Sequence, residues 1–279
     1  PAAIPKLMVS TMAFTRYLSP AVGKDITIMP SIADIWGLNR VTKQVVHNAA
    51  TAIAGMVRDY RKMEAEAEPV IGITTLGSAV NTFALRIKPA LEEKGYEVMV
   101  FHSNGPGGRA LEDLIRQGII GGVLDLSLHE LICHYCEGDC DPGEDRLEAA
   151  AEMGIPQVVS CASVDFFGWP LPLGALPPHR RQRKMHQHNP LVWIVRTSAQ
   201  ELSTIGEMAA IKLNKAKGPV IMLIPMKGFS ALDTPGGLFY DPDANKAFIE
   251  AFESHANINI KIVKLDLHIN DPQFSEEAA

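Results

Sequence analysis

Short apolar runs alternate with longer amphipathic segments along most of this chain. The runs lack a regular alternation of apolar and polar positions, which is typical of strands buried on both faces. They lie at 70–75, 97–102, 119–124, 156–160, 220–224 and 258–263. Helical spacing of apolar residues marks the segments between them, at 80–94, 109–117, 144–153, 199–215 and 243–254. The pattern predicts an α/β fold with a doubly wound, mostly parallel sheet and helices on both faces.

The beginning of the chain is less regular. Apolar runs at 7–12 and 26–29 are compatible with short strands, and 39–66 is compatible with one long helix. We therefore divide the chain into an irregular N-terminal segment with a long helix, residues 1–65, and a main α/β domain, residues 66–279. Because Pro1 resembles the middle of a longer polypeptide, we expect the first segment to pack on a missing N-terminal domain or on a partner chain.

The stretch 166–190 is rich in proline and histidine and shows no period. Structureless loops longer than about 12–15 residues are uncommon unless they are functional or disordered. We therefore expect a long functional loop here, with a disordered surface excursion as the alternative.

Composition and charge exclude several classes of protein. Of 279 residues, 47% are hydrophobic and 21% charged, which is typical of a folded globular protein and excludes a disordered chain. No apolar run approaches the roughly 20 residues that cross a bilayer, so we expect no membrane partner. The net charge of −6 argues against nucleic acid, which binds basic surfaces. Four cysteines are too few for a disulfide scaffold and favour a cytoplasmic location.

Two polar loops follow predicted strands, at the sheet edge where ligands bind in open parallel sheets. Their glycines let a ligand approach the backbone, and a helix start supplies free N–H groups to an anion. The candidate ligand-binding residues are Thr75, Gly77 and Ser78 in the first loop, and His102, Asn104, Gly105, Gly107, Gly108 and Arg109 in the second. These residues predict a small anionic ligand; the alternative is that the glycines only make tight turns.

Further candidate residues carry acid–base or metal-binding groups. Glu130, Asp165 and His188 are the candidate catalytic residues, and Asn189 is a further ligand-binding candidate. His186 and His188 are two positions apart, so on an extended chain they face the same side and can hold a divalent metal. The alternatives are helix capping for the acidic segment and backbone hydrogen bonds for the histidines.

A cysteine cluster leaves its chemistry open. Cys133, Cys136 and Cys140 have a C-x2-C-x3-C spacing that suits zinc or an iron–sulfur cluster, but no second CxxC follows. Cys161 is a possible fourth ligand for an iron–sulfur cluster. The alternative is a set of free thiols in a flexible loop.

The segment His102–Glu112 resembles the signature of the Tm-one-like ATP-binding family. Further segments agree with that family at 5–11, 34–39, 48–56, 145–149, 188–190, 196–197, 213–219, 239–242 and 268–271. The resemblance implies that this chain is the C-terminal half of a two-part protein whose absent N-terminal domain, or separate subunit, binds ATP. The cysteine cluster, the segment from Asp165 and the link before His188 depart from the family pattern.

Two classes of function follow. The first is an enzyme, a possible hydrolase or lyase, that binds a small anionic or phosphorylated metabolite and catalyses its hydrolysis or carbon–carbon cleavage. Polar groups without a recognisable redox cofactor favour such a reaction. The second is a non-catalytic nucleotide-binding or protein-interaction module. In either case we expect a homo- or hetero-oligomer.

Overall fold

The computed structural model describes residues 2–13, 21–35, 37–61, 69–76, 86–170 and 172–279. The chain forms two compact units, residues 1–67 and 68–279. In the first unit, the strands β1 (Leu7–Ser10) and β2 (Thr27–Pro30) pair in parallel. The helix α1 (Arg40–Arg58) follows, and the Asn39 side chain caps its first turn. The helix is shorter than the 39–66 predicted from the sequence.

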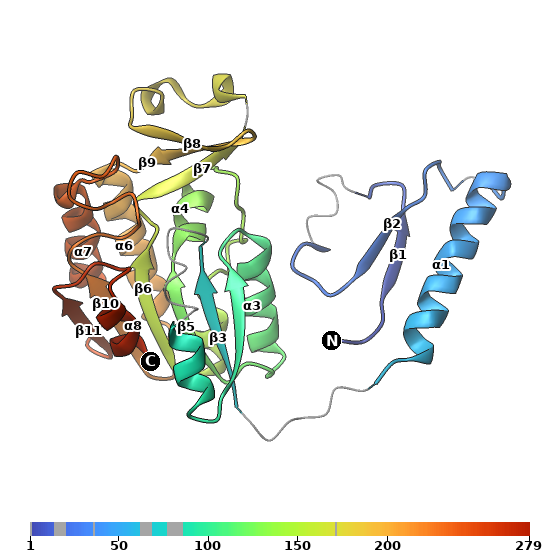
Figure 1. Cartoon of the computed structure of the whole chain (residues 1–279), viewed down its shortest axis with the longest axis horizontal. Helices are drawn as coiled ribbons and strands as arrows, with labels where there is room; N and C mark the ends of the chain where they lie inside the picture. The colour runs from blue at the N-terminus through green and yellow to red at the C-terminus, as the bar shows by residue number, and fades with distance from the viewer. Residues whose placement is uncertain (1, 14–20, 36, 62–68, 77–85, 171) are drawn as a thin grey trace. The chain divides into compact units, whose positions relative to one another are not determined.

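The second unit is built on a six-stranded sheet in which every described pair of neighbours is parallel. The strand order is β11-β10-β6-β5-β3-β4 (Figure 1). The strands are β3 (Val70–Thr75), β4 (Glu97–His102), β5 (Gly122–Ser127), β6 (Gln157–Ala162), β10 (Val220–Pro225) and β11 (Ile260–Leu265). Strand order reverses at β3, since β4 lies on one side of it and β5 on the other. In doubly wound sheets, ligands bind at the carboxyl ends of the strands at such a switch point.

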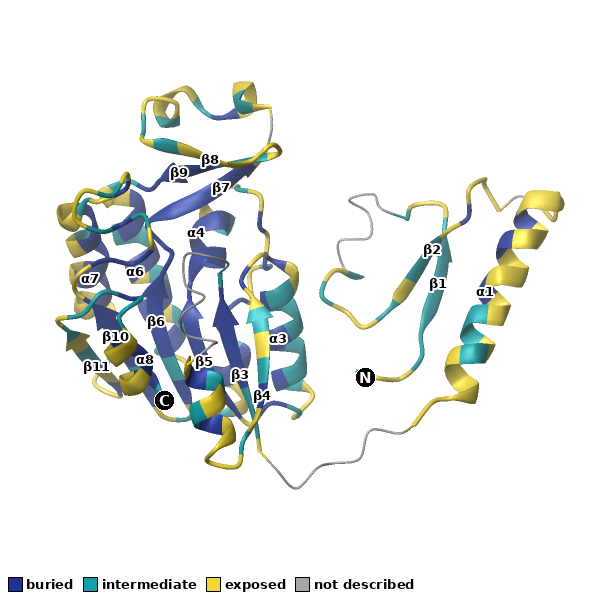
Figure 2. Ribbon diagram, in the orientation of Figure 1, coloured by how far each residue is buried: buried dark blue, intermediate teal, exposed yellow. Residues whose placement is uncertain are grey.

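Helices cover both faces of this sheet. The α-helices in the described residues of this unit are α3 (Pro106–Arg116), α4 (His129–Tyr135), α5 (Ala149–Met153), α6 (Ala199–Leu213), α7 (Pro242–His255) and α8 (Pro272–Ala278). Successive residues of a strand face opposite sides. Accordingly, Met222 of β10 lies in the apolar core with α6 and α7, whereas Leu223 lies in the core with α8. Figure 2 shows the central strands buried, and all of β5 is buried. The predicted fold class is confirmed.

The boundary of α5 differs from the prediction for a physical reason. The sequence predicts a helix over 144–153, but α5 begins only at Ala149. Leu147 has a φ of 73°, in the left-handed region that interrupts a right-handed helix. The Glu112 carboxylate accepts hydrogen bonds from the backbone N–H groups of Leu147 and Ala149, both at 2.6 Å. A side chain from α3 thus stabilises the interruption.

The two ends of the predicted long loop at 166–190 are strands of a second sheet. Strands β7 (Phe166–Pro170), β8 (Met185–Asn189) and β9 (Val192–Arg196) pair antiparallel in the order β7-β9-β8. Between β7 and β8 lie the short 3-10 helices η2 (Leu173–Ala175) and η3 (Pro178–Arg180). In Figure 1 this sheet lies above the carboxyl ends of the parallel strands. The expectation of an irregular loop was wrong at the two ends of this segment, because buried residues such as Phe167 and Val195 form pairs that local sequence does not reveal.

Candidate functional site

A cavity of about 350 Å³ lies between the carboxyl ends of the parallel strands and the three-stranded sheet. Its lining combines residues from the two loops after β3 and β4, the start of α4, the turn before Cys140, the antiparallel sheet and the loop after β10. They are Leu76, His102, Asn104, His129, Asp139, Cys140, Phe166, Gly168, His186, His188, Asn189, Val192, Ile194, Ala231 and Leu232. The cavity thus lies at the switch point of the sheet.

Strand β8 contributes three predicted residues to this cavity: His186, His188 and Asn189. The pairing of β8 with β9 shifts between Gln187 and Asn189, which is a local bulge. A bulge changes the direction of the side chains that follow it, which accounts for two successive residues, His188 and Asn189, reaching the same cavity. The Asn189 Oδ1 atom accepts hydrogen bonds from the backbone N–H groups of Leu191 and Val192. The NH₂ group of the same side chain is the group that can donate a hydrogen bond to a ligand.

The end of β4 contributes His102 and the loop after it contributes Asn104, and both line the cavity. Gly107 has a packing role here, because a Cβ atom at this position would lie 1.9 Å from the His102 carbonyl oxygen. The helix α3 can therefore begin directly against the end of β4 only with glycine at this position. The glycine that the sequence associates with a ligand makes room for the protein's own backbone.

The N–H groups at the start of α3 are bound by the protein itself. The Glu130 carboxylate accepts hydrogen bonds from the Gly105 N–H at 2.5 Å and the Gly108 N–H at 3.1 Å. A helix start favours an anion at this point, and an internal carboxylate takes that place. Ligand contacts by Gly105, Gly107 and Gly108 stay predictions, and none of these glycines lines the cavity.

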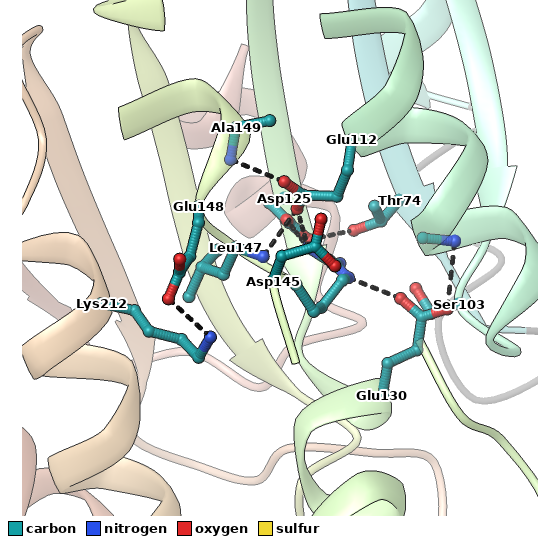
Figure 3. Close-up of polar contacts among 12 residues, drawn as sticks. Thr74, Ser103, Glu112, Asp125, Glu130, Asp145, Leu147, Glu148, Ala149 and Lys212 are labelled. Atoms are coloured by element: carbon teal, nitrogen blue, oxygen red, sulfur yellow. Dashed lines mark hydrogen bonds and ion pairs between the residues drawn. The ribbon is translucent and has the colours of Figure 1, made fainter. Parts of the chain in front are cut away.

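Glu130 belongs to a buried ionic network that Figure 3 shows in close-up. The Arg146 guanidinium, which is fully buried, binds the carboxylates of Glu130, Asp125 and Glu112 at 2.6, 2.5 and 3.3 Å. Thr74 donates a further hydrogen bond to Asp125 at 2.8 Å. Burial raises the pKa of Glu112 even though Arg146 opposes that shift. This network joins α3, β5 and α4, and it gives Glu130 a structural role; its predicted catalytic role stays a prediction.

Asp165 lies in a second buried network rather than on the cavity wall. Its Oδ2 atom accepts a hydrogen bond from the Ser230 hydroxyl at 2.7 Å, and the Arg196 guanidinium binds its backbone carbonyl at 2.9 Å. Burial raises the pKa of Asp165 to about 6, although Arg196 opposes the shift. Since Asp165 does not line the cavity, its proposed catalytic role stays a prediction.

Of the remaining predicted ligand-binding residues, Arg109 and Thr75 contact other groups of the protein. The Arg109 guanidinium binds the carboxylate of Asp141 at 2.8 Å and its backbone carbonyl at 3.0 Å. Thr75 is buried at the end of β3, where its carbonyl accepts the Ser103 N–H. Gly77 and Ser78 lie outside the described residues. Neither Thr75 nor Arg109 lines the cavity, so their ligand contacts stay predictions.

A cluster of metal-ligating side chains lies at the cavity wall. It consists of His129, Cys133, Asp139 and Cys140, whose ligand atoms all lie within 4.8 Å of one another. His129 begins α4 and Cys133 follows one turn later, so the helix places both on one side. The hydrogen bond with Cys133 and burial together raise the pKa of the Cys140 thiol. Within the described residues, His186 and His188 do not belong to such a cluster.

The three cysteines of the predicted cluster therefore lie in two different environments. Cys133 and Cys140 lie in the metal-ligating group, whereas the Cys136 thiol points to Glu201, with its sulfur 3.6 Å from Oε1. Burial raises the pKa of Cys136 to about 12. Sequence reasoning missed His129, although the His-x3-Cys spacing on a helix could have indicated it.

Sequence comparison identifies the family. Residues 68–279 match the C-terminal domain of the Uncharacterised protein family (UPF0261). The chain belongs to the UPF0261 family. Residues 1–62 match the N-terminal domain of the same family, so the expectation that this chain contains only the C-terminal half is corrected.

Several UPF0261 relatives align with almost the whole chain. A UPF0261 protein of Clostridium tetani is 41% identical over 275 residues, which span 98% of this chain and 67% of that protein. The ToMV resistance protein Tm-1(GCR237) of Solanum lycopersicum is 37% identical over 287 residues, which span 99% of this chain and 37% of that protein. The family resemblance is thereby confirmed in this coarser form.

Structural comparison is less informative. A thioesterase domain from the curacin biosynthetic pathway aligns with a TM-score of 0.34 and 11% identity, over 77% of this chain and 92% of that chain. A likeness at that level carries no conclusion about function. Of the helices in the described residues, none combines the length and apolar character that crossing a bilayer requires.

Proposed function

We propose that this UPF0261 protein binds a small anionic metabolite in the cavity and catalyses its hydrolysis or carbon–carbon cleavage. The observation that carries the proposal is the division of the cavity lining into polar and apolar residues at the switch point. Small-molecule sites are concave, mostly apolar and supplied with a few convergent polar groups. This cavity has that composition and a volume of about 350 Å³, within the usual range for such sites.

The polar residues suit an anionic group. Asn104 and Asn189 carry amide donors, and His102, His186 and His188 carry imidazoles that donate when protonated. Leu76, Phe166, Val192 and Leu232 offer apolar contact to a carbon skeleton. A carboxylate or phosphate ester of a small metabolite combines both features.

Histidine is the side chain best suited to move protons near neutral pH. We assign general acid–base roles to His188 and His186, which reach the cavity from the same strand. His188 is the more important of the two in this proposal, because it lies in the bulge beside the Asn189 amide. A ligand group bound by that amide is therefore next to His188.

The test is a search for ligands followed by a search for turnover. Calorimetry and thermal shift on the full chain would screen inorganic phosphate, sugar phosphates and short dicarboxylates. Mass spectrometry would then follow each bound compound for hydrolysis or cleavage products. We expect His188→Ala to lower turnover about 100-fold, the lower end for loss of a general acid–base group, and His186→Ala to lower it less.

The control is His255→Ala, which removes a histidine on α7 that does not line the cavity and should leave turnover unchanged. Equal losses in the His186 and His188 variants would remove the special role of His188. A bound anion that is never converted would instead support a binding module. Binding of ATP, the cytoplasmic location and assembly into an oligomer remain parts of this proposal.

A further inference from the structure

We propose that His129, Cys133, Asp139 and Cys140 bind one zinc-class divalent ion at the wall of the cavity. The site stands on its own geometry and does not require that the proposed reaction occurs. It differs from the histidine pair 186 and 188 that the sequence indicates as a metal site.

The donor set suits zinc by type and number. Two thiolates, one imidazole and one carboxylate make four ligands, the number in a tetrahedral zinc site, and thiolate with imidazole favours zinc over the hard cations Mg²⁺ and Ca²⁺. Zinc bonds of about 2.0–2.3 Å place tetrahedral ligand atoms roughly 3.3–3.8 Å apart. An ion with those bond lengths therefore needs ligand atoms already gathered at such separations.

Three of the separations between these atoms are close to this requirement. The His129 Nε2 atom lies 3.2 Å from the Cys133 sulfur, and that sulfur lies 3.8 Å from the Asp139 Oδ1 atom. The same Asp139 oxygen lies 3.3 Å from the Cys140 sulfur. All four ligand atoms lie within 4.8 Å of one another, so binding requires only that the more distant pairs move closer.

The orientation of His129 is also set for a metal ligand. Its Nδ1 atom lies 3.0 Å from the Ser163 carbonyl oxygen. A carbonyl can only accept, so this contact places the proton on Nδ1 and leaves the Nε2 lone pair toward Cys133. Ligating histidines commonly have such a second hydrogen bond, which fixes the ring and its tautomer.

The turn that carries the other two ligands is tightly packed. The Asp139 N–H donates to the Gly168 carbonyl on β7 at 3.0 Å, and the Gly138 N–H donates to the Cys133 carbonyl at 2.8 Å. A Cβ atom at Gly168 would lie 2.0 Å from the Asp139 Oδ1 atom. Glycine at 168 therefore allows β7 to pack directly against the Asp139 carboxylate and hold it in the cluster.

The position of the site connects it with the cavity. His129, Asp139 and Cys140 line the cavity, and Asp139 is the exposed member of the four, whereas the other three are buried. Asp139 is thus the ligand that an anionic group in the cavity would replace most readily. This last step rests on the proposed function; the binding of the ion does not.

Binding releases protons. Each of the two thiols gives its proton to the buffer when it becomes a thiolate ligand, and His129 binds the ion in its neutral form.

The test uses the purified full chain under a thiol reductant, without any metabolite. We expect elemental analysis after zinc loading and desalting to give one ion per chain. Cobalt in its place should give the visible spectrum of a tetrahedral site with thiolate-to-metal bands. Absence of a retained ion, or a cobalt spectrum without thiolate bands, would overturn the proposal.

Variants locate the ion. Cys133→Ser and Cys140→Ser should weaken zinc binding at least 100-fold, and Asp139→Asn about tenfold, because the loss of even a second-shell partner costs 10–100-fold. Cys136→Ser is the matched control, since Cys136 lies between the two ligands in sequence and contacts Glu201 instead. It should bind zinc like the unmodified chain, and an equal loss in this variant would contradict the assignment.

A second measurement covers variants that do not fold. Alkylation of the unmodified chain, followed by peptide mass spectrometry, should show zinc protecting Cys133 and Cys140 but not changing the labelling of Cys136 and Cys161. Equal protection of all four thiols would count against a local site. Since no metabolite is present, these results are independent of the screen for the proposed function.

Discussion

Two polar clusters meet at the start of α4, where the adjacent residues His129 and Glu130 face in different directions. Glu130 faces the interior, where both of its oxygens are bound by Gly105, Gly108 and Arg146. His129 faces the cavity with Asp139 and Cys140, and Cys133 belongs to the same cluster. The first cluster is a closed network of charges that hold the fold together. The second gathers metal-ligating groups beside a space that a ligand can enter.

The comparison shows why the kind of residue is a weak guide to its role. A carboxylate next to a glycine-rich helix start is an attractive catalytic group in the sequence. In the structure that carboxylate is itself the anion bound at the helix start. Polar groups that bind one another fully stabilise the protein, whereas polar groups that face a cavity remain available for chemistry.

The largest effect is expected from breaking the closed network. Arg146→Met leaves the carboxylates of Glu112, Asp125 and Glu130 buried without their shared cation. Removal of one partner from a buried ionic group costs about 3–5 kcal/mol, so the free energy of unfolding should fall by about that amount. Urea denaturation followed by circular dichroism would measure it.

The matched control is Lys246→Met. Its ion pair with Glu250 at 3.3 Å is exposed, and such pairs contribute at most about 1 kcal/mol. Similar losses in the two variants would show that the Arg146 network is no more important for stability than an ordinary surface pair.

An intermediate effect on stability is expected at Glu201, which connects α6 with the segment between β7 and β8. Glu201 of α6 binds Arg180 and Arg183, which lie in the connection between β7 and β8. Burial by itself raises the pKa of Glu201, but the Ser198 N–H and the two arginines lower it below its usual 4.5. A carboxyl with a lowered pKa stabilises the fold above its unfolded-state pKa, and this stabilisation disappears as the pH falls through the folded-state pKa.

Glu201→Gln should therefore reduce the free energy of unfolding at pH 7 by about 1.5–3 kcal/mol, the range for hydrogen bonds to charged groups. The difference from the unmodified chain should shrink as the pH falls below 4.5. Thermal unfolding at a series of pH values would measure it. A difference that is constant with pH would show that packing, rather than charge, is responsible.

The smallest effect is expected at Arg109. It tests whether the start of α3 contacts a ligand or only other groups of the protein. Asp141, the partner of Arg109, is largely exposed, so Arg109→Ala should lower the free energy of unfolding by less than about 1 kcal/mol. Because Arg109 does not line the cavity, the affinity for an anion bound there should change less than twofold. Calorimetry with inorganic phosphate would measure this affinity. A tenfold loss would restore Arg109 as the ligand contact that the sequence indicates.

Most of the parallel sheet was accessible from the sequence, because strands buried on both faces have continuous apolar runs. The strand pairing of β7, β8 and β9 was not accessible, because partners such as Trp169 and Trp193 are far apart in the chain. Of the predicted site residues, His102, Asn104, His186, His188 and Asn189 line the cavity. Gly105, Gly107, Gly108, Glu130 and Asp165 do not, since long-range packing brought other protein groups against them.

The sequence by itself determined the alternation of strands and helices, and thus the sheet edge at which polar loops gather. Local periodicity carries that information because it reflects which side of each element is apolar. Only the tertiary structure decided that His129 faces the cavity while Glu130 faces Arg146, and that Cys133 and Cys140 lie with Asp139 while Cys136 lies with Glu201. Those choices depend on contacts between elements distant in the chain, which no local pattern records.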